Sequence, residues 1–464
     1  MNIVVLNGSP KGDVSVTMQY VRYLQEVFPQ HQMTIHNIAQ QLPKLERDPD
    51  AFGAIVEAVR AADGVLWAFP LYYFAVHGNY KRFIELIWER GAQEAFRGKY
   101  AASLSTSIHF YDHAAHAYIE AICDDLEMRY VSAFPAAMQD LLRPEGRAQL
   151  QAFGRDFFAA IEAGLPTQRS YAPLRPRAFA YVPGPAASQA PRNGRRILIV
   201  TDAQPAQANL IGMVERFAAA WDGPVEVINL HQVDIKGGCL GCIRCGPDNE
   251  CAYAGKDGFI DFYNDKVRAA DILVFAGAIK DRYLSSRWKT FFDRSFFKTH
   301  TPTLIGKQIA FIISGPLSQI APLREVLQAW VEIERANLVG FITDEEGDAA
   351  EIDGRLDGLA RRLAAAAAAA YVRPQSFLGV GGMKVFRDDV WGPLRLTFYA
   401  DHRAYRKLGL YDFPQRNWSQ RLANFILIPL LRIPPIKEQF RSRTREGMVV
   451  PYKKVVDAAG SEAP

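Results

Sequence analysis

The sequence predicts an α/β protein with two tandem, doubly wound, parallel five-stranded sheets and an irregular, partly helical C-terminal extension. Two observations predict this fold class. Short apolar runs alternate with amphipathic helical patterns as far as Arg373, the order of β–α units that build a parallel sheet. The alternation also starts a second time at Arg196, which indicates a duplicated scaffold.

The first domain, residues 1–165, contains five strand candidates, and each is followed by a helical pattern. The strand candidates are NIVVL, MTIHN, GVLWAF, KYAASLS and YVSAF, and the helices lie near 15–28, 51–61, 79–89, 113–126 and 146–161. Residues 166–195 are rich in proline, alanine and arginine, which predicts an extended linker.

The second domain, residues 196–373, repeats this order, and residues 374–464 form the extension. Its strand candidates are RILIV, VEVINL, DILVFA, QIAFIIS and LVGFIT. Ser15 corresponds to Asn209 at an offset of 194 positions, whereas Lys81 corresponds to Lys289 at an offset of 208. About fourteen extra residues therefore lie between the first and third strands of the second domain, where a cysteine-rich loop occurs. We expect this loop to be an insertion on the duplicated scaffold.

Composition and charge exclude several classes of protein. The chain has 464 residues, 49% hydrophobic and 22% charged, which is a globular composition. A net charge of +4 is too small for this length to indicate nucleic-acid binding. No apolar run reaches the ~18 residues of a spanning helix, and no signal-peptide pattern precedes NIVVL. We therefore expect a cytoplasmic protein, in which clustered cysteines more often bind metal or do redox chemistry than form disulfides.

Three loops at strand ends carry residues suited to a ligand. VVLNGSPKGDVSVT offers amides, hydroxyls and a helix N-terminus to a phosphate, although a plain turn capped by Ser15 has the same pattern. FPLYYF offers flat apolar surface to a planar ring, or to a neighbouring subunit. STSIHFYDH contains Ser105, Thr106 and His109, which could hydrogen-bond to such a ring or carry a proton.

The combination of NGSPKGDVSVT, PLYYF and GNYKRFIELI resembles the flavodoxin-like NAD(P)H-dependent FMN reductases over residues 1–165. The resemblance implies a flavodoxin-like fold, an FMN cofactor and NAD(P)H as electron donor. It also implies that the first loop holds the FMN phosphate and that the other two line the isoalloxazine ring. The implied cofactor residues are Ser9, Lys11, Ser15, Thr17, Pro70, Leu71, Tyr72, Tyr73, Phe74, Ser105 and Thr106, with His109 as the candidate catalytic residue.

The second domain lacks the residues of the first loop. The positions that correspond to Ser9, Lys11, Ser15 and Thr17 are Ala203, Pro205, Asn209 and Ile211. Pro205 also removes an amide donor. We therefore predict that the second domain binds FMN weakly or not at all.

The loop GGCLGCIRCGPDNEC holds Cys239, Cys242, Cys245 and Cys251. Zinc, a [4Fe–4S] cluster and reactive thiols are all open, but two successive C-x2-C spacings with a fourth cysteine nearby favour the cluster. The loop, with the later WKTFFDRSFF, resembles the iron–sulfur flavoproteins over residues 196–373. That resemblance implies a cluster that exchanges single electrons with a flavin near a subunit interface. One half of this chain would then keep the flavin and the other the cluster.

The sequence thus predicts a flavin-dependent oxidoreductase that passes electrons between NAD(P)H or a protein donor, FMN in the first domain and a [4Fe–4S] cluster in the second. One alternative is a plain NAD(P)H-dependent reductase of FMN, quinones, azo or nitro compounds without a cluster. Others are a non-catalytic electron carrier between larger redox partners and a structural zinc module. We also expect a homo-oligomer. The apolar, proline-broken stretch at 422–436 is surrounded by basic residues, so a peripheral membrane contact and an apolar strap packed on the protein are both open.

Overall fold

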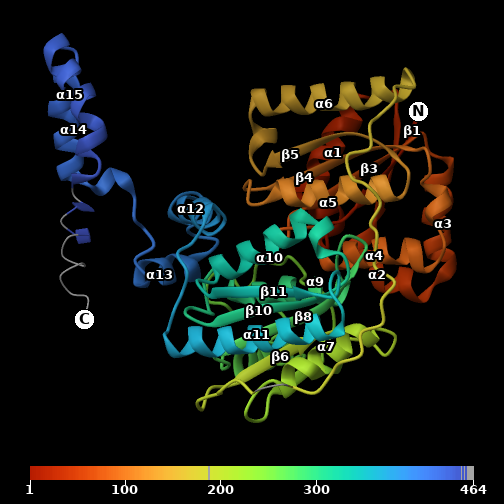
Figure 1. Cartoon of the computed structure of the whole chain (residues 1–464). Helices are drawn as coiled ribbons and strands as arrows, with labels where there is room; N and C mark the ends of the chain where they lie inside the picture. The colour runs from red at the N-terminus through yellow and green to blue at the C-terminus, as the bar shows by residue number, and fades with distance from the viewer. Residues whose placement is uncertain (187–188, 451, 454, 457–464) are drawn as a thin grey trace. The chain divides into compact units, whose positions relative to one another are not determined.

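The structure, a computed structural model, describes residues 1–186, 189–450, 452–453 and 455–456 (Figure 1). Residues 1–404 form one compact unit, and residues 405–464 belong to a second unit. The first unit contains two parallel sheets with helices on both faces, so the predicted α/β fold class is confirmed.

The first sheet has the strand order β2-β1-β3-β4-β5, and all of its neighbouring strands are parallel. Its strands are β1 Asn2–Asn7, β2 Gln32–Asn37, β3 Gly64–Pro70, β4 Tyr100–Ser107 and β5 Arg129–Ala137. The helices of this half are α1 Val16–Val27, α2 Ile38–Arg47, α3 Pro49–Ala61, α4 Gly78–Glu89, α5 Asp112–Asp125 and α6 Pro144–Glu162.

Helix α2 is the one element of this half that the sequence patterns missed. Its Pro43 removes a backbone donor, so the carbonyl of Ala39 would lose its intrahelical hydrogen bond. The side-chain amide of Asn79 donates to that carbonyl at 2.8 Å. A side chain from α4 therefore makes the helix compatible with its proline.

The second sheet repeats the order of the first as β7-β6-β8-β10-β11, again with parallel neighbours. A short antiparallel strand, β9, pairs with β8 in addition to the five predicted strands. The strands are β6 Ile197–Thr201, β7 Glu226–Asn229, β8 Ile272–Lys280, β9 Tyr283–Leu284, β10 Gln308–Ser314 and β11 Asn337–Thr343. The helices are α7 Ala208–Ala219, α8 Phe259–Phe262, α9 Ser286–Arg294, α10 Ala321–Ile333 and α11 Ala349–Ala368.

The strand boundaries confirm where the two halves differ in length. β2 and β7 begin at an offset of 194 positions, whereas β3 and β8, and likewise β4 and β10, begin at an offset of 208. The extra residues therefore lie between β7 and β8. The cysteine loop occupies this interval, as the insertion predicted from the sequence requires.

The two halves meet through a pseudo-symmetric pair of helices, α4 and α9. Glu85 of α4 accepts hydrogen bonds from the backbone amide and hydroxyl of Ser286, at 2.6 and 2.7 Å. Asp293 of α9 in turn accepts from the amide of Gly78 at 2.6 Å. Both acceptors and both donors correspond at the offset of 208. Reciprocal contacts of this kind are those of a two-fold dimer interface, here contained in one chain.

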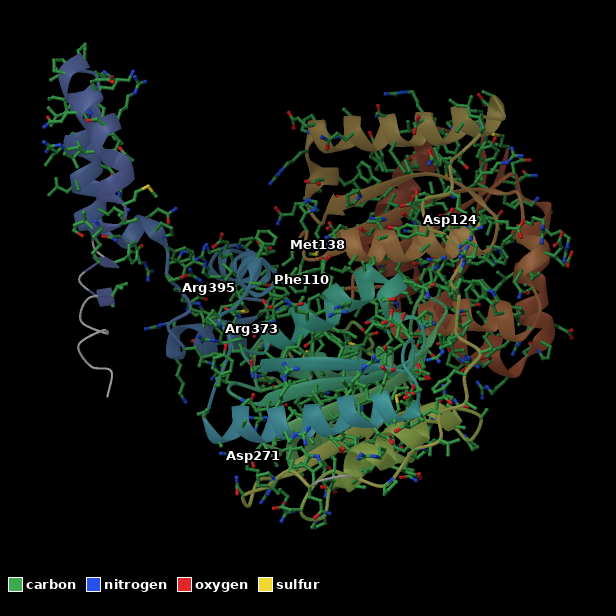
Figure 2. All side chains as sticks on the ribbon, in the orientation of Figure 1. Phe110, Asp124, Met138, Asp271, Arg373 and Arg395 are labelled. Carbon is green, nitrogen blue, oxygen red and sulfur yellow. The ribbon has the colours of Figure 1, made fainter. Side chains whose placement is uncertain are left out.

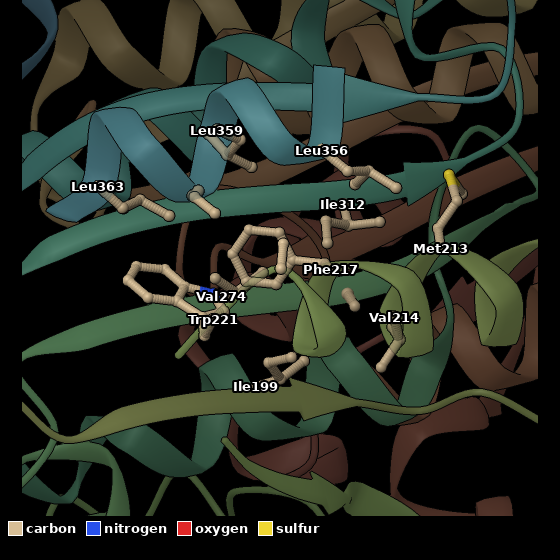
Figure 3. Close-up of a cluster of buried hydrophobic side chains, with 14 of the residues drawn as sticks. Ile199, Met213, Val214, Phe217, Trp221, Val274, Ile312, Leu356, Leu359 and Leu363 are labelled. Carbon is tan, nitrogen blue, oxygen red and sulfur yellow. The ribbon is translucent and has the colours of Figure 1, made fainter. Parts of the chain in front are cut away.

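The core of the second half lies between its sheet and the pair α7 and α11. Figure 3 shows Phe217 and Trp221 between the sheet residues and Leu359 and Leu363 of α11. Tyr181 of the linker belongs to this same cluster and is buried. The described part of the linker has no helix or strand, yet it packs against the second half through Tyr181.

The extension is helical, in agreement with the prediction of a partly helical segment. Its helices are α12 Phe377–Trp391, α13 Tyr399–Lys407, α14 Trp418–Leu430 and α15 Pro434–Gly447. None of the helices in the described part of the chain is long and apolar enough to cross a membrane.

Candidate functional site

A cavity of about 390 Å³ lies at the carboxyl ends of β1, β3 and β4, between the two halves of the first unit. This volume is in the range of small-molecule sites, which usually measure ~300–1,000 Å³. All three loops that the sequence singled out contribute to its wall. From the predicted set, the lining residues are Lys11, Ser15, Thr17, Pro70, Leu71, Tyr72, Tyr73, Phe74 and Thr106.

The first loop is held in shape by its own polar side chains. Asn7 accepts from the amide of Ser9 at 2.9 Å, and the Ser9 hydroxyl accepts from the amide of Lys11 at 3.2 Å. The Ser15 hydroxyl caps α1 by accepting from the amide of Met18 at 3.3 Å. The positive end of the α1 dipole therefore opens at the cavity, beside the lysine, which is an arrangement that favours an anion.

Thr17 and Thr106 join the first loop to the third. Their hydroxyl oxygens lie 2.6 Å apart, and both residues line the cavity. The two loops are thus in direct contact where a ligand could touch both.

The aromatic rings of the second loop, residues 70–74, have different surroundings. Tyr73 and Phe74 have φ values of 35° and 66°, an uncommon and strained backbone for large side chains. The hydroxyl of Tyr73 donates to the carbonyl of Thr299 in the second half at 3.3 Å. Phe74 packs on Phe110 with ring centroids 4.9 Å apart. Tyr73 thus reaches the second half of the chain, whereas Phe74 packs within the first half.

Three predicted site residues, Ser9, Ser105 and His109, are not among the residues that line the cavity. Ser9 is buried and shapes the loop, as described above. Ser105 is hydrogen-bonded to His116 Nε2 at 2.8 Å, and burial lowers the pKa of His116 to about 4. The side chain of His109 is 53% exposed, and its Nδ1 lies 2.9 Å from the carboxylate of Asp112.

The far wall of the cavity comes from residues that the sequence patterns did not single out. They belong to the second half and to the extension, and they are mostly aromatic or apolar. These residues are Phe296, Lys298, Thr299, His300, Trp330, Ile333, Glu334, Phe386, Leu394, Thr397 and Phe398. Phe110 and Met138 of the first half line the same cavity, and Figure 2 labels both. No motif could have identified this wall, since it is assembled from parts far apart in the chain.

Asp401 organises one part of that wall. Its buried carboxylate accepts from the hydroxyls of Thr299 and Thr301 at 2.6 and 2.8 Å. The same carboxylate lies 2.7 Å from His300 Nδ1. Thr299 has a φ of 54°, a strained value for a β-branched residue. Asp401 therefore fixes a strained turn that places His300 in the cavity wall.

The corresponding loop of the second half is closed by its own side chains. Asp202 stands where the first half has Gly8, accepts from Trp288 Nε1 at 2.9 Å, and has its pKa raised to about 6 by burial. Asn209 donates to the carbonyl of Phe179 and accepts from the amide of Tyr181, both at 2.9 Å. A buried carboxyl group and the linker residues 179–181 thus lie against the loop that corresponds to the first loop of the first half.

The four cysteines of the loop line one small space of about 20 Å³, and Cys242 among them is exposed. All four are free of disulfides. Burial raises the pKa of both Cys239 and Cys245 to about 12, and neighbouring cysteines add to both shifts. Within the described residues, no group of three or more His, Cys, Asp or Glu side chains is arranged to hold a metal ion.

The space between the cysteines and the larger cavity share a wall. Gly241, Ile243 and Phe296 line both. Gly241 has a φ of +63°, and a Cβ added there would lie 2.1 Å from the hydroxyl of Tyr72. The cysteine loop and the second predicted FMN loop are therefore in van der Waals contact.

His77 makes a second connection between these loops. Its Nδ1 accepts from the amide of Asn79 at 3.1 Å, so Nε2 carries the hydrogen. That Nε2 donates to the carbonyl of Cys239 at 2.8 Å. The ring of Tyr72 packs edge-on against His77 with centroids 4.8 Å apart. The first half thus fixes the backbone at the start of the cysteine loop.

A family model described as NADPH-dependent FMN reductase matches residues 1–139. This match confirms the resemblance to FMN reductases over that range, whereas the resemblance to iron–sulfur flavoproteins stays a prediction. No curated protein matches the chain.

Solved structures similar to part of the chain include three oxidoreductases. The flavoenzyme NAD(P)H:(acceptor) oxidoreductase FerB from Paracoccus denitrificans is 22% identical and covers 35% of this chain and 97% of its own, with a TM-score of 0.30. The apo form of the NADH:FMN oxidoreductase EMOB is 20% identical and covers 36% and 92%, with a TM-score of 0.30. An FMN-dependent NADH-azoreductase from Bacillus anthracis, in complex with FMN, is 15% identical and covers 35% and 99%, with a TM-score of 0.26.

Proposed function

We propose that this protein is a flavin-dependent oxidoreductase that binds FMN in the cavity of the first half. The observation that carries the proposal is the convergence of three separately predicted loops on one cavity, within the range that matches the FMN reductase model. Bound FMN would supply hydride and single-electron chemistry, with NAD(P)H or a protein as the donor. The alternative is a reductase without a cluster, and it is tested with quinones, azo compounds and nitro compounds as electron acceptors.

Each part of the site has a separate role in this proposal. Lys11, Ser15 and Thr17 hold the phosphate at the N-terminus of α1, because this end offers a cation, hydroxyls and the helix dipole together. Residues 70–74 and Thr106 lie against the ring, while Ser9 and Ser105 support the loops from behind. His109 is kept as the candidate for proton delivery to this edge of the site.

We further propose that the cysteine loop holds a [4Fe–4S] cluster. All four cysteines line one small space, and a cluster of this kind takes four thiolates, although the described side chains would have to rearrange to hold a metal. The backbone amide of Gly241 donates to the sulfur of Cys239 at 3.5 Å, a contact of the type that tunes clusters. The wall shared with the FMN cavity gives electrons a short path between the two sites.

Anaerobic purification with FMN, iron and sulfide analysis tests both parts. We expect about four irons and four sulfides per chain. Cys242→Ser should lower the iron content and bleach the cluster absorbance. Cys123→Ser is the matched control, because Cys123 is buried in α5 outside the loop. Zinc without iron, or equal iron in both variants, would overturn the cluster and leave the FMN proposal standing.

Reduction by different donors separates the remaining alternatives. Rapid bleaching of FMN by NAD(P)H alone supports a reductase. Reduction by ferredoxin with no response to NAD(P)H supports an electron carrier between larger redox partners. If the purified protein binds no FMN at all, the proposed function is wrong.

Three further expectations from the sequence are kept as proposals. The domain boundaries at 165, 195 and 373 are tested by limited proteolysis. A cytoplasmic location agrees with five free cysteines, which a reducing compartment favours. Homo-oligomerisation is tested by sedimentation velocity of the full chain.

A further inference from the structure

The helices α14 and α15 expose an unusual amount of apolar surface. Trp418 is 73% exposed and Phe425 is 79% exposed. The described side chains of α14 are exposed along its whole length. Single exposed apolar residues are common in proteins, but a contiguous exposed set indicates a surface that meets something apolar.

The apolar residues are spaced to form a stripe on each helix. In α14, Trp418, Leu422, Phe425 and Ile426 follow the i, i+4, i+7, i+8 pattern of one helix face. Near the end of the helix, Leu427, Ile428 and Leu430 extend the exposed apolar surface beyond that face. Around α15, the apolar positions 433, 436 and 440 follow the i, i+3, i+7 pattern. We call these two stripes together the apolar hairpin face.

The charges beside this face have a single dominant sign. The described basic residues are Arg421, Arg432, Lys437, Arg441 and Arg443, and Glu438 is the carboxylate among them. Such a surface complements an anionic one. A second copy of the hairpin would bring the same positive charges together, which opposes self-pairing.

The length of α14 excludes a membrane span. Thirteen residues extend about 20 Å, whereas the hydrocarbon core is about 30 Å thick. A short helix with an apolar stripe and flanking cations is instead suited to lie in the plane of the interface.

We propose that the apolar hairpin face docks on the surface of a bilayer that contains anionic lipid. The apolar stripe enters the boundary between headgroups and acyl chains, and the flanking cations pair with lipid phosphates. This inference does not depend on the flavin or the cluster. It assigns a partner to the extension that the proposed redox function leaves unexplained.

Co-sedimentation of the full chain with vesicles tests the proposal. We expect binding to phosphatidylcholine vesicles that contain about a third phosphatidylglycerol, weaker binding to phosphatidylcholine alone, and a decrease as salt is raised. Phe425→Asp should weaken binding roughly tenfold or more, because burial of this ring is lost. Arg432→Gln with Lys437→Gln should weaken binding to the anionic vesicles by roughly tenfold or more.

Phe377→Asp is the matched control, since Phe377 of α12 is 85% exposed and lies outside the hairpin. Equal binding by Phe425→Asp and this control would overturn the proposal, as would a lack of vesicle binding by the unmodified chain. Sedimentation velocity without vesicles tests whether a second copy of the chain occupies the face instead. A dimer that Phe425→Asp dissociates would overturn the membrane proposal and assign the face to a second copy. FMN content, measured on each variant, keeps a failure of docking distinct from a failure of the proposed function.

Discussion

Gly241 is one of the residues that line both proposed redox sites. Its φ of +63° favours glycine, and a methyl group there would meet the hydroxyl of Tyr72 at 2.1 Å. We therefore predict that Gly241→Ala lowers the free energy of unfolding by about 2–4 kcal/mol, from backbone strain plus overpacking. Urea denaturation at constant m-value measures this change.

A double-mutant cycle separates the two causes. Tyr72→Phe removes the clashing oxygen, and the ring carbon that carries it lies 3.4 Å from the added methyl, an ordinary contact. The double variant should recover all but about 1 kcal/mol, the cost of strain alone. Gly91→Ala supplies that cost independently, because Gly91 has a φ of +64° and nothing within 4 Å. Strict additivity of Gly241→Ala and Tyr72→Phe would contradict the contact.

At the scale of elements, the contact of α4 with α9 holds the two halves together. Glu85 and Asp293 are buried, and each pairs with a lysine on its own helix and with the N-terminus of the other. Glu85→Gln should therefore lower the free energy of unfolding by about 3 kcal/mol, and Asp293→Asn should have a similar effect. Glu57→Gln, an exposed pair on α3, is the control and should change it by less than about 0.5 kcal/mol.

The carboxylate of Glu85 also predicts how the free energy of unfolding depends on pH. Burial opposes ionisation of Glu85, but Lys81 and Ser286 lower its pKa from 4.5 to about 2. A lowered pKa in the folded state stabilises the protein above the unfolded value, and this contribution is lost as pH falls from 4.5 towards 2. The Glu85→Gln variant should lose less stability than the unmodified chain over that interval, as measured by urea denaturation at each pH. An identical pH profile for the two proteins would contradict the assigned role.

Some elements could be predicted from the sequence, and others depend on contacts that no local pattern contains. The strands of both sheets follow from their apolar runs, since buried parallel strands are continuously apolar. Helix α2 could not be predicted, because the donor that replaces the missing amide of Pro43 comes from Asn79. Tyr181 of the predicted linker enters the core of the second half, and the composition of the linker did not indicate this contact.

At the scale of the whole molecule, the repeat alignment carried most of the predictable information. It located the cysteine loop as an insertion, and it predicts that the first half keeps the residues for a phosphate. The far wall of the cavity lies beyond this reasoning, because Lys298 and His300 come from the second half and Phe386 comes from the extension. The three loops of the first half are thus a necessary but incomplete description of the site.

The division of labour proposed for the two halves predicts a stoichiometry that can be measured. In the second half, Asp202 and the linker residue Tyr181 lie at the loop that corresponds to the first loop of the first half. Saturation with FMN should therefore give close to one FMN per chain. Thr17→Val should weaken FMN binding by about tenfold, since it removes a hydroxyl that lines the cavity at the phosphate end. Thr201→Val removes a hydroxyl at the end of β6 in the second half, where it accepts from the amide of Ala203, and should leave FMN binding unchanged. Isothermal titration of apo-protein with FMN distinguishes these outcomes, and a second FMN per chain that Thr201→Val removes would show that both halves retain a flavin site.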